Sequence, residues 1–167
     1  PDLFRLVYMD KQTGSILLNN TCEIIFMGGA KLDDKLEQEI IESGIPLMMV
    51  YGQTETGLAI SLSPYGYHRV GSSGKIVEGM TARIADNGEI LVTGENVMLG
   101  YYKNPEATAQ KIDADGWLHT GDRGYLDEDG YLYVEGRLEQ DMIVLPNGEN
   151  IHPDNIERKI NALPEVA

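Results

Sequence analysis

The sequence is poor in residues that cross-link a chain or hold a metal. Its one cysteine, Cys22, cannot form a disulfide within the chain, and its apolar neighbours favour a buried thiol in a reducing, cytoplasmic compartment. The three histidines, at 68, 119 and 152, do not share a spacing typical of zinc ligands. The acidic stretches 113–116 and 127–130 do not fit a calcium loop, so we interpret both as acidic turns.

Basic residues and long apolar runs are also scarce. The chain has 13 Lys and Arg residues against 27 Asp and Glu, and its net charge of −14 argues against nucleic acid as a partner. No apolar run approaches the ~20 residues of a membrane helix, so no transmembrane segment is expected. The 167 residues suffice for one domain or two small ones. Because the sequence begins at a proline and ends without a polar tail, we expect an internal piece of a longer protein.

The first part of the chain predicts a βαβ unit. Apolar runs at 23–30 and 45–52 are typical of buried strands. Between them, residues 32–44 have the apolar period of an amphipathic helix, with Asp33 or Asp34 as its N-cap. Since the two strands of such a unit are parallel, their carboxyl ends meet at one edge of the sheet, where ligands bind in open α/β folds.

After about residue 71 the pattern changes to antiparallel strands. Apolar and polar residues alternate on both sides of the turn signals at 87–88 and 129–130, and a further hairpin is predicted around 147–148. A short helix is predicted at 104–112. We therefore predict a mixed α/β fold: the end of an open α/β sheet layer, then an antiparallel, distorted β-barrel subdomain, then the first strands of a small mobile C-terminal domain.

Four segments carry polar residues that a buried core does not need. They are YGQTETG at 51–57, GEILVTGENVMLGYYKNPEAT at 88–108, GWLHTGDRGYLDEDGYLYVEGR at 116–137 and MIVLPNGENIHPDNIE at 142–157. In this order they closely resemble the later core motifs of the adenylate-forming enzymes: acyl-CoA synthetases, luciferases and non-ribosomal peptide adenylation domains. The last segment is most similar to the long-chain fatty acyl-CoA synthetase branch.

The resemblance implies an acid–thiol ligase. Such enzymes activate a carboxylic acid with ATP to an acyl-adenylate and pyrophosphate, and then pass the acyl group to a thiol. We expect a fatty acid as the acid, coenzyme A as the thiol and Mg²⁺ as the metal, while a carrier protein stays an alternative acceptor. The implied domains are the end of the α/β subdomain at 1–70, the β-barrel subdomain at 71–137, a hinge at 138–141 and the start of the C-terminal domain at 142–167.

The resemblance also implies roles for individual residues. Tyr51 provides a flat face for adenine, Asp122 binds both ribose hydroxyls, and Arg137 assists it. Thr54 and Glu55 are the implied catalytic residues, because Thr54 donates to the α-phosphate and Glu55 holds Mg²⁺. The complete implied nucleotide set is Gly28, Gly29, Ala30, Tyr51, Gly52, Gln53, Thr54, Asp122 and Arg137. The aromatic residues Tyr101, Tyr102 and Trp117 are interpreted as packing residues.

Two catalytic parts of the family have no counterpart in these residues. One is a Ser/Thr/Gly-rich loop that cradles the triphosphate, and the other is a lysine beyond the last motif. We therefore expect the chain by itself to be inactive. The hinge register is also open, because Glu139, Gln140 and Asp141 are all candidates. The alternatives to a ligase are a non-catalytic nucleotide-binding or adenylate-binding module of the same fold and a purely structural β module.

Overall fold

The computed structural model describes residues 25–29, 32–42, 47–63, 68–138, 143–144, 150–151 and 160. The sequence predictions for Cys22, Ala30, the turn at 147–148 and the hinge candidates Glu139, Gln140 and Asp141 lie outside the described residues.

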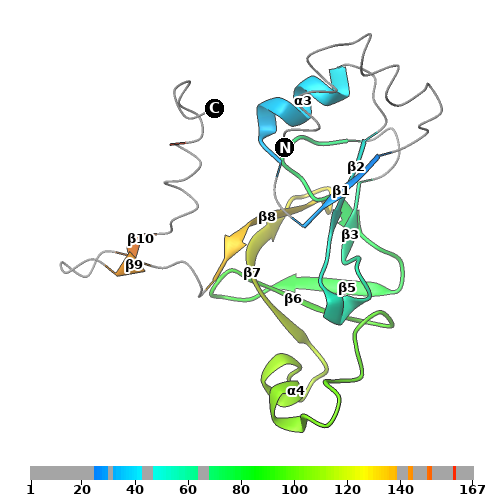
Figure 1. Cartoon of the computed structure of the whole chain (residues 1–167), viewed down its shortest axis with the longest axis vertical. Helices are drawn as coiled ribbons and strands as arrows, with labels where there is room; N and C mark the ends of the chain where they lie inside the picture. Colours follow the sequence, from blue (N-terminus) through cyan, green and yellow to red (C-terminus); the bar gives the residue numbers. More distant parts are fainter. Residues whose placement is uncertain are drawn as a thin grey trace.

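The first sheet begins with the predicted βαβ unit (Figure 1). Strand β1 (Ile25–Gly28) pairs in parallel with strand β2 (Leu47–Tyr51), and helix α3 (Asp34–Glu42) connects them. Strands β3 (Ser61–Leu62) and β4 (Lys75–Ile76) then extend the sheet in antiparallel fashion, in the order β1-β2-β3-β4. The parallel pairing confirms the predicted unit and places the ends of β1 and β2 at the same edge.

Helix α3 has a local start signal and a buried face. The Asp33 carboxylate accepts hydrogen bonds from the backbone N–H groups of Lys35 and Leu36, so Asp33 is the N-cap and the open choice with Asp34 is settled. Ile40 is fully buried and packs with Leu47 and other residues of the sheet. Burial of this side chain contributes about 1.5–3 kcal/mol to holding the helix on the sheet.

The second sheet is an antiparallel meander in the order β5-β6-β7-β8. Its strands are β5 (Met80–Ile84), β6 (Glu89–Gly94), β7 (Leu118–Leu126) and β8 (Leu132–Arg137). Irregular register within β6–β7 and within β7–β8 accompanies the curl of the sheet that Figure 1 shows. This is the curled half of the predicted antiparallel barrel.

The predicted local signals of this sheet are confirmed. Gly88 and Gly130 have positive φ angles of 85° and 79° in the two hairpin turns, a conformation that favours glycine. Helix α4 (Pro105–Lys111) lies between β6 and β7 in sequence, and Asn104 caps it by accepting from the Ala107 N–H group. Strands β9 (Ile143–Val144) and β10 (Asn150–Ile151) pair in antiparallel fashion, as the hairpin prediction requires.

The two sheets share one core. Ile60, which precedes β3, is fully buried together with Ile90, Val92, Leu118 and Leu132 of the second sheet. The backbone N–H of Leu132 also donates to the carbonyl oxygen of Gly74, which precedes β4. The first sheet thus reaches residue 76, and the division of the chain near residue 70 stays a prediction.

The acidic stretches form matching turns. In each one the first aspartate, Asp113 or Asp127, accepts from the backbone N–H groups two and four residues later, at 3.0 and 2.8 Å. The interpretation of both stretches as acidic turns is confirmed. None of the described helices is long and apolar enough to cross a membrane.

Candidate functional site

The loop after β2 is fixed by its own backbone. Residues Thr54–Thr56 form a short 3-10 helix, and Gly57 ends it in the left-handed conformation with a φ of 61°. Gln53 precedes this turn, and its backbone N–H donates to the fully buried Thr56 hydroxyl at 3.1 Å. A Cβ on Gly52 would collide with the carbonyl oxygen of Leu58. The glycine is therefore needed for the close approach of the loop to itself.

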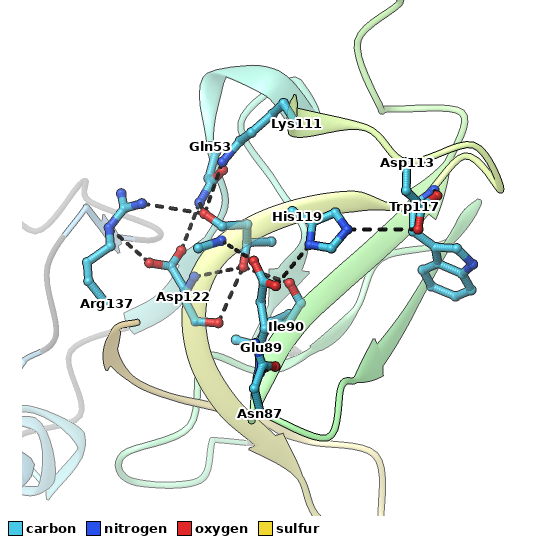
Figure 2. Close-up of polar contacts among 12 residues, drawn as sticks. Gln53, Asn87, Glu89, Ile90, Lys111, Asp113, Trp117, His119, Asp122 and Arg137 are labelled. Carbon is cyan, nitrogen blue, oxygen red and sulfur yellow. Dashed lines mark hydrogen bonds and ion pairs between the residues drawn. The ribbon is translucent and has the colours of Figure 1, made fainter. Parts of the chain in front are cut away.

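Asp122 connects this loop to the second sheet. It lies on β7 with only 6% of its surface exposed. Its Oδ2 accepts from the Tyr51 hydroxyl at 2.7 Å and from the Gln53 side-chain amide at 2.8 Å. Its Oδ1 pairs with Nε of Arg137 at 3.0 Å, because Asp122 and Arg137 are register partners on β7 and β8 (Figure 2). The structure thus brings together four residues that lie up to 86 positions apart in the chain, from 51 to 137.

The Tyr51 hydroxyl is bonded to the carboxylate rather than to solvent. Burial, with the charge of Asp122 as a second cause, raises the pKa of Tyr51 well above its usual value, so the phenol stays protonated and acts as a donor. The ring packs against the shared core and is half-buried. A half-buried ring held by its hydroxyl at the end of a strand is suited to presenting one face to a flat ligand.

Three donors converge on the carbonyl oxygen of Thr120, two residues before Asp122. The Gln53 amide lies 2.8 Å from this oxygen, the Lys111 ammonium 3.2 Å and Nη1 of Arg137 3.4 Å. Figure 2 shows Lys111 and Gln53 side by side above this strand, with Arg137 on the other side of Asp122. Lys111 lies outside all four sequence motifs, so sequence reasoning missed it.

Glu55 is hydrogen-bonded to Tyr101, a residue that the sequence analysis interprets as a packing residue. The Tyr101 hydroxyl donates to Oε1 of Glu55 at 2.7 Å. This hydrogen bond is the main reason that the pKa of the Glu55 carboxyl lies below its usual value, and it raises the pKa of Tyr101. The interpretation of Tyr101 and Tyr102 as packing residues is therefore wrong: Tyr101 contacts a proposed catalytic carboxylate, and Tyr102 is 88% exposed.

The remaining implied residues lie at the expected edge of the first sheet. Gly28 ends β1 directly opposite Val50, and a Cβ on it would come within 2.7 Å of the Val50 carbonyl oxygen. Gly29 is exposed and has a φ of 85°, which favours glycine. Thr54 is exposed on the loop, with its hydroxyl available to a ligand. Gly28 and Gly29 thus lie at the end of β1, the strand that is parallel to the one ending at Tyr51.

A cleft of about 380 Å³ opens beside this cluster. Its lining includes Lys111, Arg137 and His119. On its floor Glu89 is nearly buried, accepting from the Gly121 N–H at 2.9 Å and lying 2.9 Å from Nδ1 of His119. The Glu89 carboxylate is therefore already engaged by partners within the chain, whereas Lys111 and Arg137 have more N–H donors than the described hydrogen bonds use.

The donor set at Glu55 fits Mg²⁺. Protein sites hold this ion through one or two carboxylates together with substrate phosphates. The second oxygen of Glu55 accepts no hydrogen bond from another described residue, and the lowered pKa keeps the group ionised. In the described part of the chain, no three His, Cys, Asp or Glu side chains gather as a cage for a metal ion. A metal here would need phosphate oxygens as further ligands.

Comparison with known proteins places this arrangement in a family. The model of a family described as AMP-binding enzyme matches residues 2–102, which is more than half of the chain. The chain belongs to the AMP-binding enzyme family. The resemblance of the sequence motifs to adenylate-forming enzymes is thereby confirmed.

Relatives of this chain are CoA ligases of different acids. A long-chain-fatty-acid–CoA ligase of Mycobacterium bovis, FadD15, is 36% identical over 98% of this chain and 26% of its own length. A 2-succinylbenzoate–CoA ligase of Geobacillus kaustophilus is 38% identical over 95% of this chain and 34% of its own length. The chain thus spans about a quarter to a third of these curated relatives.

A solved structure has the same fold. The o-succinylbenzoate CoA synthetase of Bacillus subtilis, in complex with an acyl-adenylate intermediate, matches with a TM-score of 0.75 and 34% identity, over 90% of this chain and 34% of that one. The mixed α/β fold class predicted from the sequence is therefore confirmed.

Proposed function

We propose that this chain is the nucleotide-binding part of an ATP-dependent acyl-CoA ligase. The single observation that carries the proposal is the cluster at Asp122, where the loop after β2 and the β7–β8 hairpin meet through Tyr51, Gln53 and Arg137. The cluster combines an aromatic face, a buried carboxylate and a cation, which suit adenine, a ribose diol and a phosphate respectively. Its location at the carboxyl ends of parallel strands is typical of nucleotide sites.

The reaction joins a carboxylic acid to coenzyme A in two steps. The carboxylate attacks the α-phosphorus of ATP, the bond to pyrophosphate breaks, and an acyl-adenylate forms; the thiol then attacks the acyl carbon and AMP leaves. The exposed Thr54 hydroxyl would donate to an α-phosphate oxygen. Glu55 would hold Mg²⁺. When bound, Mg²⁺ would neutralise the negative charge that develops on the phosphate oxygens.

Ribose binding requires a rearrangement at Asp122. Its Oδ2 already accepts from two donors, whereas among the described residues Oδ1 accepts from Arg137 alone. One ribose hydroxyl can therefore donate to the free lone pair of Oδ1, and a second requires Tyr51 or Gln53 to release Oδ2.

The ribose assignment is tested by changing the residue and the ligand together. In the full-length enzyme, isothermal titration should show AMP binding about tenfold or more tighter than 2′,3′-dideoxy-AMP, since hydrogen bonds to a charged group contribute about 1.5–3 kcal/mol. Asp122→Asn should bind both nucleotides with the same weak affinity. Asp86→Asn, a change in the exposed β5–β6 turn, is the matched control. If Asp122→Asn still prefers AMP as strongly as the wild type does, Asp122 does not bind the ribose.

For the acid, we propose a fatty acid. This choice is supported by the similarity of the segment at 142–157 to fatty acyl-CoA synthetases and by the M. bovis relative, whereas the G. kaustophilus relative is named for a ring-bearing dicarboxylic acid. Steady-state kinetics of the full-length enzyme on straight-chain acids of graded length and on 2-succinylbenzoate measures the preference. A higher kcat/KM for succinylbenzoate than for every straight-chain acid would replace the fatty-acid assignment.

The domain organisation belongs to the same proposal. We propose that residues 138–141 are the hinge and that the hairpin of β9 and β10 opens a mobile, smaller domain, as the motif order implies. We also propose that the enzyme acts in the cytoplasm.

A further inference from the structure

Lys111 is a cation in the candidate site that no motif accounts for. It is the last residue of helix α4, and its ammonium reaches back to β7, where it donates to the Thr120 carbonyl oxygen at 3.2 Å. The same oxygen accepts from Gln53 and Arg137, both members of the proposed nucleotide set. A lysine from a separate helix therefore lies among the nucleotide residues.

The ammonium retains binding capacity. It has three N–H donors, and Thr120 uses one of them. Among the described residues, the structure pairs Lys111 with no carboxylate. Lys111 also lines a cleft of about 380 Å³ together with Arg137. Two donors and a full positive charge are thus free for an anion.

Lys111 lies close to the residue proposed to bind the ribose. Asp122, the proposed ribose residue, is two residues from Thr120 along β7, and the Gln53 amide donates at 2.8 Å to both the Thr120 carbonyl oxygen and Oδ2 of Asp122. The Lys111 ammonium shares that carbonyl oxygen, so it lies close to the Asp122 carboxylate. A nucleotide with its ribose on Asp122 and its metal on Glu55 must place its 5′-phosphate between these carboxylates. Lys111 and Arg137 line the cleft of about 380 Å³ that opens beside the Asp122 cluster.

We propose that Lys111 binds the 5′-phosphate of the nucleotide, as a ligand supplied by helix α4 from outside the family motifs. The inference rests on the proposed function and adds a phosphate-binding residue to it. The anion recognised is the phosphate monoester of AMP, or the corresponding α-phosphate of ATP and of the acyl-adenylate. Charge-assisted hydrogen bonds from the ammonium to the phosphate oxygens would replace or supplement its bond to Thr120.

A structural role for Lys111 makes a different prediction. A lysine in the last turn of a helix stabilises the negative end of the helix dipole, and its bond to Thr120 also ties α4 to β7. Loss of such a role would disturb the strand that carries Asp122, and would weaken binding of every adenine nucleoside equally. If Lys111 instead binds the phosphate, its loss weakens the binding of AMP and leaves the binding of adenosine unchanged.

The experiment compares AMP with adenosine on the full-length enzyme by isothermal titration. Lys111→Met should lower the affinity for AMP by about tenfold, because one hydrogen bond between charged groups is lost. It should leave the affinity for adenosine unchanged. Lys111→Arg should recover most of the AMP affinity. Lys103→Met is the matched control, since that lysine lies over the exposed Tyr102 ring, and it should change neither affinity.

Two results would overturn the assignment. An equal loss of AMP and adenosine affinity in Lys111→Met would make the lysine structural, and unchanged affinity for both would remove it from the site. The wild type is measured first: if it binds neither ligand, the proposed function fails before Lys111 is tested, so the two failures are distinguishable.

Discussion

At the scale of single residues, the Tyr101 hydroxyl orients the proposed metal ligand. It holds Oε1 of Glu55 at 2.7 Å and leaves the other carboxylate oxygen without a described partner. We expect Tyr101→Phe to weaken Mg²⁺ binding by about three- to tenfold, because the carboxylate loses a hydrogen bond of about 1 kcal/mol or more and becomes free to rotate. The measurement is electron paramagnetic resonance of Mn²⁺, used as a Mg²⁺ substitute, bound to the full-length enzyme with ATP.

The neighbouring tyrosine provides the control. Tyr102 has the same side chain, lies next in sequence and is 88% exposed, so Tyr102→Phe should leave Mn²⁺ binding unchanged. Equal Mn²⁺ affinity in Tyr101→Phe and the wild type would show that the hydroxyl does not position Glu55. ATP affinity without metal, measured in the presence of a chelator, should be the same in all three proteins.

At the scale of elements, the loop from Gly52 to Leu58 determines where the site residues lie. Because a Cβ on Gly52 collides with the Leu58 carbonyl oxygen, Gly52→Ala must push the two arms of the loop apart. We expect a destabilisation of about 1–3 kcal/mol, the usual cost of overpacking, together with loss of AMP affinity. Chemical denaturation of the full-length enzyme measures the first effect, and titration with AMP measures the second.

Thr54→Ala, in the same loop, separates the two effects. The Thr54 side chain is exposed, so its removal should leave the free energy of unfolding unchanged while AMP affinity falls. If Gly52→Ala unfolds at the same denaturant concentration as the wild type, the backbone contact with Leu58 is not needed for the loop.

The elements themselves were predictable where their signals are local. The Asp33 cap, the glycine turns at 88 and 130 and the capped helix at 104–112 depend on residues within four positions of each other. The order of the nucleotide motifs put Tyr51 and Asp122 in one predicted set, and the structure joins them by a hydrogen bond, while their role toward a nucleotide stays a prediction.

Contacts between distant residues were not predictable in the same way. Glu37 is 1% exposed on helix α3, paired with His68 and bonded to the Gly71 N–H, yet in the helical pattern it is one more charged residue. Tyr101 and Lys111 were missed for the same reason. Their partners, Glu55 and Thr120, depend on how the loop after β2, helix α4 and strand β7 pack against one another. A single sequence carries no periodic signal from which such packing could be predicted.

At the scale of the whole molecule, we expect the 167 residues to contain the residues for nucleotide binding without those needed for turnover. The residues proposed to hold adenine, ribose and Mg²⁺ lie within these 167 residues, whereas the triphosphate loop and the lysine implied by the family have no counterpart among them. We expect the 167-residue chain alone to release no pyrophosphate from ATP and a fatty acid, since the leaving group would be neither cradled nor charge-stabilised. A coupled pyrophosphate assay, with the full-length enzyme as the positive control, makes the measurement. Circular dichroism of the same sample establishes that the chain is folded, and turnover by the folded chain above the rate without protein would show that these residues contain a complete catalytic set.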